Sequence, residues 1–420
     1  MPNRHDAQGE TVNSNSRRMI QASVVADARS VHAPGVVLVE DGRVLASGAP
    51  EVVGTPGPDV VVDSHPGHLV APPMVNAHVH LDLSDLPPLP EAGDFDGWIG
   101  AIIRHRRAQQ APGAVEAAVE QGVAASLRGG CPFVGDVCGS IRAYRALAAS
   151  VLGGVGFVEV LGHGSRIDAA RALVDAIGEL APSRHGLVPG CSPHAPYSTA
   201  VGVYTAAQAS GLPVSTHLAE SQEELAWCRD GGGPFGTRLA AMGYAPEEVP
   251  PPGAHPLEAY LPRLEPSPRT VVAHANYCEP RHLEALAEHG ATVVYCPRAY
   301  RYFGHPQDGA TAHPWAAMLR AGVPVALGTD GRPCLPASGP AANRLSIADE
   351  VLLLQEDGAT LEQWLPMATV HGAAALGVPL EQVLIEPGVT TGLIALPLES
   401  SNPVRIRPGH DVLTLLGPGA

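Results

Sequence analysis

The sequence predicts an α/β protein in which a (β/α)8 TIM barrel is joined to a small β-sandwich domain built from both chain ends. Two observations support this prediction. Between about residues 69 and 376, eight short apolar strand candidates alternate with helix candidates rich in Ala, Leu and Glu. At both ends of the chain, strand-like runs follow one another without a long helical stretch.

The chain ends are expected to form the smaller domain. The first 18 residues are polar and show no periodicity, which favours a disordered leader. Short apolar runs begin at Met19, and Asp41-Gly42 between two of them is a strong hairpin signal. Similar runs return after Gly392. The predicted leader, sandwich and barrel are, in this order, residues 1–18, residues 19–68 with 377–420, and residues 69–376.

The barrel prediction depends on counting strands and the helices between them. The first strand candidate ends in Val75-Asn-Ala-His-Val-His-Leu-Asp82. The other seven are residues 131–136, 155–161, 187–192, 213–217, 270–274, 292–296 and 323–330. Helix candidates between them include residues 114–120, 141–149, 167–180 and 284–288. A doubly wound open sheet is the alternative, but no Gly-x-Gly-x-x-Gly follows the first strand.

Composition excludes several classes of protein. The longest apolar runs stay below the roughly 18 residues that a membrane helix needs, and the start lacks the order of a signal peptide, so a cytoplasmic enzyme without a membrane partner is expected. Seven cysteines without a Cys-x-x-Cys pair favour reduced thiols. A formal charge of −16 argues against nucleic acid as a partner and favours a small-molecule substrate.

All 26 basic residues are arginines, because the chain contains no lysine. This absence excludes a lysine Schiff base, a P-loop lysine and a carboxylated lysine that bridges two metal ions. Any metal site must therefore be built from other side chains.

Histidines and carboxylates gather where the predicted strands end. His78 and His80 are two residues apart, so both imidazoles point to one side of an extended strand and form half of a metal site. In a TIM barrel the chemistry lies at the carboxyl ends of the strands. Those ends carry His78, His80, Asp136, Glu159, His194, His217, His274 and Asp330. Taken alone, Asp136 and Glu159 are interpreted as hydrogen-bonded strand ends. The spacing of His80, His217, His274 and Asp330 favours a site shared by strands one, five, six and eight.

Four stretches resemble the motifs of the amidohydrolase superfamily, in the mononuclear-metal branch that holds cytosine, guanine and adenosylhomocysteine deaminases and related chlorohydrolases. In chain order they are Val75-Asn-Ala-His-Val-His-Leu81, Thr216-His-Leu-Ala-Glu220, Val272-Ala-His274 and Leu327-Gly-Thr-Asp330. Two more segments look like those of deaminase-like members: Ser192-Pro-His-Ala-Pro-Tyr-Ser198 and Tyr295-Cys-Pro-Arg298. The match spans nearly the whole chain, and all four motifs occur in order at strand ends.

The resemblance implies one divalent metal ion. Its ligands would be His78, His80, His217 and Asp330, and His274 would hydrogen-bond the water or the substrate oxygen. Three imidazoles and a carboxylate suit zinc, the favoured metal, or iron(II). Such a metal lowers the pKa of water to about 7 and makes hydroxide available as the nucleophile.

Two carboxylates could move protons during the reaction. Asp330 can take the proton of the water, and Glu220 can deliver a proton to a ring nitrogen and then to the departing amine. The alternative for Glu220 is a solvated acid in the first turn of a helix, because Ser221-Gln-Glu-Glu224 follows and helix N-termini favour acids.

Substrate contacts are expected from five side chains outside this set. For His194 a hydrogen-bonded strand end and a substrate contact are weighed equally. Arg298, Tyr302 and His305 follow strand seven and could bind an anionic or ring substituent, although they could equally be parts of a surface loop. Trp98 resembles a residue of the segment that covers the pocket in relatives, and it could otherwise be a core residue.

These residues are compatible with three functions. The favoured one is a metal-dependent aminohydrolase that releases ammonia from an amino-substituted purine, pyrimidine or nucleoside-like compound such as aminodeoxyfutalosine. The second is hydrolysis of a cyclic amide or another leaving group, as in imidazolone or triazine hydrolases. The third is a catalytically silent barrel that binds a ligand. A homodimer is expected only because homo-oligomers are common among soluble enzymes.

Overall fold

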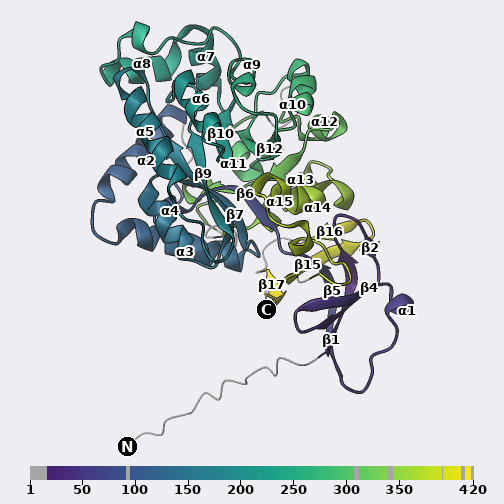
Figure 1. The fold of residues 1–420 in the computed structure, drawn as a ribbon. Helices are drawn as coiled ribbons and strands as arrows, with labels where there is room; N and C mark the ends of the chain where they lie inside the picture. Colours follow the sequence, from purple (N-terminus) through teal and green to yellow (C-terminus); the bar gives the residue numbers. More distant parts are fainter. Residues whose placement is uncertain are drawn as a thin grey trace, which may run out of the picture.

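A parallel sheet forms the centre of the larger domain (Figure 1). The computed structural model describes residues 17–90, 95–306, 312–338, 344–389, 391–407 and 412–417. Within these residues the sheet runs in the order β13-β12-β11-β10-β9-β8-β7-β6-β14. Its strands are β6 (Val75–His80), β7 (Phe133–Cys138), β8 (Gly153–Val160), β9 (Leu187–Pro193), β10 (Val214–Leu218), β11 (Thr270–His274), β12 (Thr292–Tyr295), β13 (Val325–Leu327) and β14 (Asp330–Gly331).

The last strand candidate closes the barrel in two pieces. β13 pairs with β12, whereas β14 pairs with β6, so the segment between them joins the two ends of the sheet. Gly328 lies at this crossing, where its N–H donates to the carbonyl of Tyr295. A Cβ atom on Gly328 would lie only 2.8 Å from the backbone oxygen of His78. The TIM-barrel prediction is confirmed, and the eighth strand is divided because two neighbours share it.

Helices cover the barrel (Figure 1). They are α2 (Phe95–Ala108), α3 (Ala114–Arg128), α4 (Ile141–Ala148), α5 (Ile167–Gly178), α6 (Val201–Ala209), α7 (Gln222–Asp230), α8 (Gly233–Ala241), α9 (Pro256–Tyr260), α10 (Leu283–His289), α11 (Pro297–Tyr302), α12 (Trp315–Arg320), α13 (Ile347–Glu356), α14 (Leu361–Ala368) and α15 (Val370–Leu376). β7 and β8 are buried at every position, as expected for parallel strands covered on both faces. Their near-continuous apolar sequence is the signal from which these strands were predicted.

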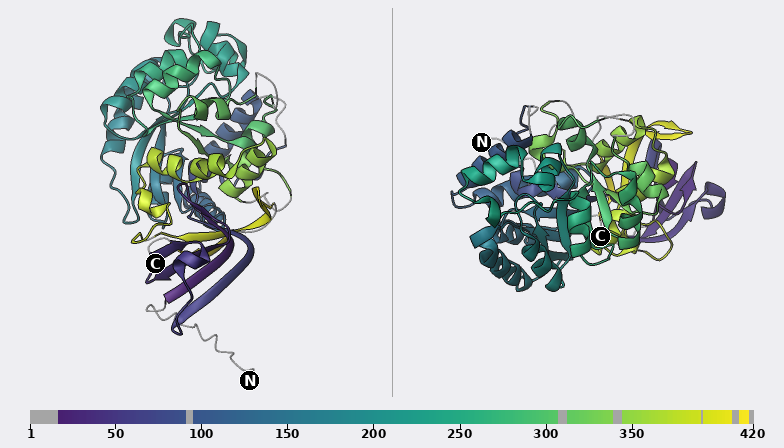
Figure 2. Two further views of the ribbon diagram at one scale, coloured as in Figure 1. Left: turned by 90° about the vertical axis from the view of Figure 1, so that its right-hand side faces the viewer. Right: turned by 90° about the horizontal axis from the view of Figure 1, so that it is seen from above.

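The two chain ends meet in the second sheet, which lies beside the barrel (Figure 2). Its path is β16-β15-β5-β1-β3-β4, while β17 pairs with β15 and β2 with β1, so the small domain is one mixed sheet of the described residues. Its elements are β1 (Arg17–Ala26), β2 (Val31–His32), β3 (Gly35–Glu40), β4 (Arg43–Gly48), α1 (Pro50–Val53), β5 (Val60–Ala71), β15 (Leu393–Ser401), β16 (Val404–Ile406) and β17 (Leu413–Leu416).

The structure describes only the last two residues of the expected leader. Residues 1–16 lie outside the described residues. Arg17 and Arg18 belong to β1, which begins two residues before the expected start of the domain. Their pairing with Val60 and Val61 on β5 explains this, because a strand continues for as long as its neighbour offers hydrogen bonds.

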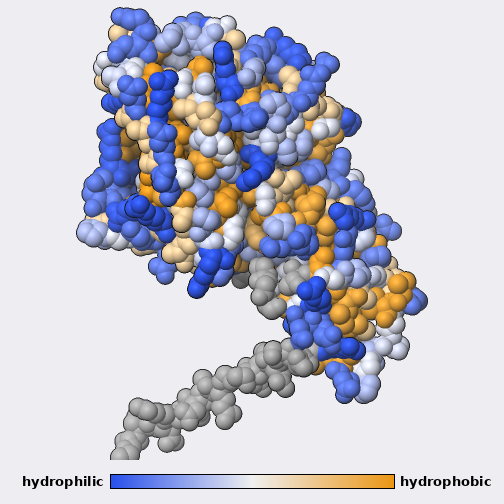
Figure 3. Space-filling view, in the orientation of Figure 1, coloured by the Kyte–Doolittle hydropathy of each residue, from blue (hydrophilic) through white to orange (hydrophobic). Residues whose placement is uncertain are grey.

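The surface is mixed in polarity. Hydrophilic and hydrophobic residues are interspersed over the barrel face seen in Figure 3, and a hydrophobic area lies on the small domain near α1. Val52 of α1 is 79% exposed. None of the helices formed by the described residues is long and apolar enough to cross a membrane.

Candidate metal and catalytic site

Three strands of the barrel, β6, β10 and β14, bring the four predicted ligands together. His78 and His80 end β6, His217 lies on β10, and the three can each offer one nitrogen within 4.8 Å of the others. Asp330 opens β14, and its Oδ1 lies 3.4 Å from Nε2 of His80 and 3.9 Å from Nε2 of His78. Glu220, His274 and Asp330 form a second group with the same spacing of donor atoms. Residues up to 252 positions apart in sequence therefore meet in one buried site.

The backbone at these strand ends is strained. Among the described residues other than glycine, positive φ angles occur at Ala219 (53°), His274 (69°), Ala275 (49°) and Asp330 (56°), with Asp41 of a surface turn as the fifth case. Non-glycine residues adopt this conformation at a cost, and such residues cluster at functional sites. Two of these residues, His274 and Asp330, belong to the groups of closely spaced donor atoms.

The histidines have the properties that a metal site requires. Both ring nitrogens of His78 and Nδ1 of His80 are buried and have no hydrogen-bond partner within the described part of the chain. Burial lowers the pKa of His78 to about 3, and burial also lowers the pKa of His80 and His217 well below the usual range. The rings are therefore neutral near pH 7, and their lone pairs are available to a cation. A metal ion would satisfy nitrogens that are otherwise costly to bury.

The carbonyl of His194 orients His217. Nδ1 of His217 lies 3.1 Å from that carbonyl oxygen, so Nδ1 donates a proton and Nε2 is left for a metal. The backbone N–H of His217 donates to the same oxygen. On its own ring, His194 hydrogen-bonds Ser198 through Nδ1 at 2.6 Å. His194 thus supports the site with its backbone and faces the pocket with its ring.

Glu220 and His274 face each other at the edge of this group. Oε1 of Glu220 lies 3.4 Å from Nε2 of His274. Burial, together with the charges of Asp330 and Glu224, raises the pKa of Glu220 well above its usual range. Burial raises the pKa of Asp330 to about 6. Glu220 is therefore suited to hold a proton, while a bound cation would favour the ionised form of Asp330.

Glu224 lies beside the site, although the sequence analysis did not single it out. It was interpreted only as an acid at a helix N-terminus, and α7 does begin there, with Ser221 accepting from the N–H of Glu224. Its carboxylate is fully buried and accepts hydrogen bonds from the backbone N–H groups of Ala219 (3.0 Å) and Glu220 (2.7 Å). Glu224 thus fixes the turn that presents Glu220. The signal in the sequence was its spacing of four residues from Glu220.

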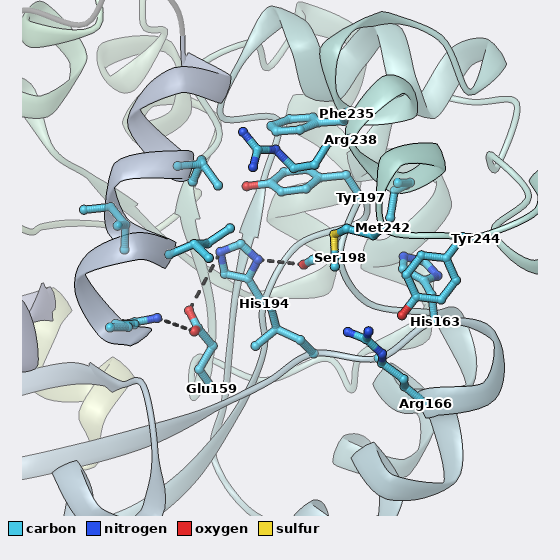
Figure 4. Close-up of a pocket in the computed structure, with 17 residues that line it drawn as sticks. Glu159, His163, Arg166, His194, Tyr197, Ser198, Phe235, Arg238, Met242 and Tyr244 are labelled. Carbon is cyan, nitrogen blue, oxygen red and sulfur yellow. Dashed lines mark hydrogen bonds and ion pairs between the residues drawn. The ribbon is translucent and has the colours of Figure 1, made fainter. Parts of the chain in front are cut away.

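Within the described part of the chain, an inner and an outer pocket at the site share five lining residues. The inner pocket, of about 40 Å³, is lined by His80, Leu83, Trp98, Ile99, Ile102, Arg106, Glu159, His194, His217, Glu220 and Asp330. The outer pocket, of about 170 Å³, lies farther from the predicted ligands and is drawn in Figure 4. Trp98 belongs to the inner pocket, and its indole nitrogen is buried without a hydrogen-bond partner among the described residues.

The sequence analysis also did not predict the ion pair between Arg106 and Glu159. Glu159 ends β8 and was interpreted as a hydrogen-bonded strand end, whereas Arg106 lies on α2. Nη1 of Arg106 donates to Oε2 of Glu159 at 2.6 Å, and the same guanidinium contacts Asp82 at 3.3 Å. The only sequence signals were the basic run at residues 104–107 and an ionisable residue at a strand end.

The remaining predicted contacts lie outside the two pockets. Arg298 is buried against Glu350 and Asp349, so its charge is used within the protein. Tyr302 donates its hydroxyl to the carbonyl of Pro90 at 3.0 Å. His305 hydrogen-bonds Tyr277, with Nδ1 2.8 Å from the hydroxyl. The described lining of the pockets contains none of Arg298, Tyr302 and His305.

Comparison with known proteins gives consistent results. The profile of the amidohydrolase family matches residues 69–405. Aminodeoxyfutalosine deaminase from Deinococcus radiodurans is 32% identical over 347 residues, which cover 77% of this chain and 76% of that protein. A 5-methylthioadenosine/S-adenosylhomocysteine deaminase from Nitratidesulfovibrio vulgaris is 30% identical over 406 residues, covering 91% of this chain and 84% of that protein.

A solved structure shares the fold. The crystal structure of an adenosine deaminase from Xanthomonas campestris with bound zinc superposes with a TM-score of 0.72 at 20% sequence identity. The superposition covers 96% of this chain and 93% of the other. At this level of identity the likeness establishes the architecture, and the chemistry must be argued from the residues of the site.

Proposed function

This chain belongs to the amidohydrolase family, and we propose that it releases ammonia from the amino-substituted ring of a nucleoside-like compound. Its family and its deaminase relatives make it a metal-dependent hydrolase of carbon–nitrogen bonds, as the sequence motifs predicted. The observation that carries the proposal is the buried carboxyl of Glu220 beside four candidate metal ligands.

The ligands in this proposal are His78, His80, His217 and Asp330. Three neutral imidazoles and one carboxylate suit a single divalent cation, and zinc is proposed over iron(II) because this donor set is typical of zinc hydrolases. The unpartnered nitrogens of His78 support this assignment. When bound, such a cation acts as a Lewis acid and lowers the pKa of water to about 7.

The side chains of the protein supply the proton transfers. Asp330 accepts the proton of the attacking water, since its carboxylate lies beside the histidines. Glu220 holds a proton near neutral pH and donates it to a ring nitrogen of the substrate, which makes the adjacent ring carbon more electrophilic. The proton taken by Asp330 then reaches the departing amine, the carbon–nitrogen bond breaks, and the proton left on the added oxygen returns to Glu220 as the ring carbonyl forms. His274, 3.4 Å from Glu220, hydrogen-bonds the oxygen that is added to the ring.

The proposal places the substrate ring in the inner pocket. The apolar side chains of Leu83, Trp98 and Ile102 line this pocket together with the carboxyl groups of Glu220 and Asp330. A flat ring with one polar edge matches such a lining. The expected homodimer remains a prediction.

The test is ammonia release from a panel of aminopurines, aminopyrimidines, nucleosides and triazines, with zinc-loaded and iron-loaded protein. Turnover of one compound, lost in Glu220→Gln but retained in Glu223→Gln, would support the proposal. Glu223 is a matched control because it lies in the first turn of α7, lines neither pocket as described, and carries the same side chain.

Two results would contradict the proposal. Hydrolysis of a cyclic amide without ammonia release would assign the site to the second predicted function. Metal content unaffected by His78→Ala or Asp330→Ala would remove the ligand assignment. Treatment with a chelator is expected to abolish turnover and to lower the melting temperature, because it leaves buried imidazoles without partners.

A further inference from the structure

His274 and Ala275 form a strained backbone segment at the end of β11. Their φ angles, 69° and 49°, lie in the left-handed region, which residues other than glycine adopt only at a cost. Such a conformation persists where the surrounding structure holds the backbone in place. The hydrogen bonds of this segment identify the groups that hold it.

The residues that follow are tied to the segment after β10. The N–H of Tyr277 donates to the carbonyl of Ala219 at 3.1 Å. Nδ2 of Asn276, a buried side chain, donates to the carbonyl of Glu220 at 3.0 Å. These two hydrogen bonds connect the chain beyond β11 to the chain beyond β10, but neither involves the carbonyl of His274.

The carbonyl of His274 is held by a histidine from the segment before α12. Nε2 of His313 lies 2.9 Å from this carbonyl oxygen, and Nδ1 of the same ring lies 3.1 Å from the backbone nitrogen of Trp315. Nδ1 accepts from the N–H of Trp315 and so carries no proton. The neutral ring therefore carries its proton on Nε2 and donates it to the carbonyl of His274.

Packing fixes the plane of the His313 ring. It stacks on Tyr295 of β12 with ring centroids 3.8 Å apart and an angle of 14° between the planes. Tyr300 of α11 meets the same ring edge-on at 5.8 Å. His313 is 7% exposed, and burial lowers its pKa to about 3, so the ring is neutral near pH 7. The Nε2–H group is therefore held in one orientation.

The ring of His274 lies among the groups of the candidate site. It stacks on His217 with ring centroids 5.4 Å apart, and its Nε2 lies 3.4 Å from Oε1 of Glu220. No hydrogen-bond partner of this Nε2 occurs among the described residues, so it is available to a ligand. A misplacement of about 1 Å at such a group can lower a rate about 100-fold.

We propose that His313 is a positioning residue: its Nε2–H holds the carbonyl of His274 and thereby keeps the His274 ring beside Glu220. This inference rests on the proposed function, in which His274 hydrogen-bonds the oxygen that is added to the substrate ring. His313 is absent from the described lining of both pockets, so it acts through His274 and not on the substrate directly. The two histidines are 39 positions apart in the chain, and His313 lies outside every motif quoted from the sequence.

Two substitutions separate the two hydrogen bonds of His313. The side-chain amide of Gln ends as many bonds from the backbone as Nε2 of His, whereas the amide of Asn ends as many bonds away as Nδ1. His313→Gln can therefore still donate to the carbonyl of His274 but cannot accept from Trp315. His313→Asn can still accept from Trp315 but does not reach the carbonyl of His274. Each variant thus loses one of the two hydrogen bonds.

Turnover by the zinc-loaded protein, with the compound found in the ammonia panel, is expected to follow the bond to His274. We expect kcat to fall at least about 30-fold in His313→Asn but less than about 5-fold in His313→Gln, with KM changed less than about 3-fold in both. Melting temperatures should fall by similar amounts, since each variant leaves one buried backbone group unpaired. The matched control is His289→Asn, which removes a similar bond, from Nε2 to the carbonyl of Leu264 at 3.1 Å, and should retain kcat.

Crystal structures of the two variants give a readout that does not depend on turnover. His274 should keep its positive φ and its distance to Glu220 in His313→Gln, and lose both in His313→Asn. If His313→Asn fails to fold, Tyr295→Leu takes its place, because this change removes the stacked ring but neither hydrogen bond. For that variant we expect a kcat at least about 5-fold lower and a displaced His274 ring.

The outcomes separate this inference from the proposed function. Equal kcat in His313→Gln and His313→Asn, or an unmoved His274 in the latter, would overturn the role of His313. In the substitute variant, an unchanged kcat or an unmoved His274 would do the same. No ammonia from any compound with the unmodified protein would contradict the proposed function, and the crystal structures would then decide the role of His313 on their own.

Discussion

Asn76 and Thr329 exchange two hydrogen bonds that join the first barrel strand to the last. The amide Nδ2 of Asn76 donates to Oγ1 of Thr329 at 2.8 Å, and Oδ1 accepts from the backbone N–H of Thr329 at 3.1 Å. Both residues are fully buried. Asn76 lies two residues before His78, and Thr329 precedes Asp330, so this contact sets the distance between the candidate ligands of the two strands.

Asn76→Ala should therefore weaken metal binding. We expect metal affinity to fall roughly 10-fold, because losing a hydrogen bond that positions metal ligands typically lowers metal affinity by at least that factor. Thermal stability should fall as well, by about 1–3 kcal/mol, since the N–H of Thr329 loses its partner. The control is Gln208→Ala, which removes two similar hydrogen bonds to Glu265 on the surface. Equal metal affinity in both variants, measured by competition with a chelator, would contradict the prediction.

Gly328→Ala should disturb the closure of the barrel. The added Cβ would lie 2.8 Å from the backbone oxygen of His78 and 2.9 Å from Sγ of Cys296. We expect a loss of roughly 1–3 kcal/mol in the free energy of unfolding, with reduced metal content. Gly178→Ala is the matched control, because nothing lies within 4 Å of the new atom and alanine favours the helix by about 1 kcal/mol. A Gly328→Ala variant as stable as Gly178→Ala would refute this account of the crossing.

Glu224→Gln should reduce turnover without removing the metal. The carboxylate accepts from two backbone N–H groups, whereas an amide offers only one acceptor and brings its own N–H toward the other. Glu220 would then be displaced, and kcat should fall roughly 10- to 100-fold with a smaller change in KM. Glu223→Gln should retain full activity. A loss of metal or a purely KM effect would show that Glu224 does not position Glu220.

Asp136→Asn should change how stability depends on pH. Burial, with the charge of Asp82 nearby, raises the pKa of Asp136 to about 7, although its carboxylate accepts from the N–H of Leu81 and the thiol of Cys138. The folded chain therefore binds this proton more tightly than the unfolded chain, whose pKa is about 4. The resulting stabilisation is fully present below pH 4 and is lost as the pH rises through 7.

The measurement is the melting temperature of both proteins between pH 5 and 8. The difference should grow in favour of Asp136→Asn as the pH rises, by roughly 1.4 kcal/mol for each unit of pKa shift that titrates in this range. Arg106, which also faces this region, should keep its charge throughout and so adds no titration of its own. Parallel curves for the two proteins would show that Asp136 does not titrate in this window.

The sequence by itself determined the architecture and the metal-binding end of the barrel. Strands of a parallel sheet are buried on both faces, so their sequences are continuous apolar runs. In a TIM barrel the carboxyl ends of these strands lie at the same end of the barrel. His78, His217 and Asp330 could therefore be placed together from their positions at strand ends. Local signals also located α7, because Ser221 and the acids after it satisfy a helix N-terminus.

Only the tertiary structure decided which other polar residues face the pocket. Arg298 and Arg106 look alike in the sequence, yet Glu350, 52 residues after Arg298, neutralises the first, while Glu159 holds the second at the junction of the two pockets. The physical reason is that the partner of a buried charge is set by packing between distant elements. Periodicity and spacing record which face of a strand or helix is buried, but they do not record which charge lies across from it.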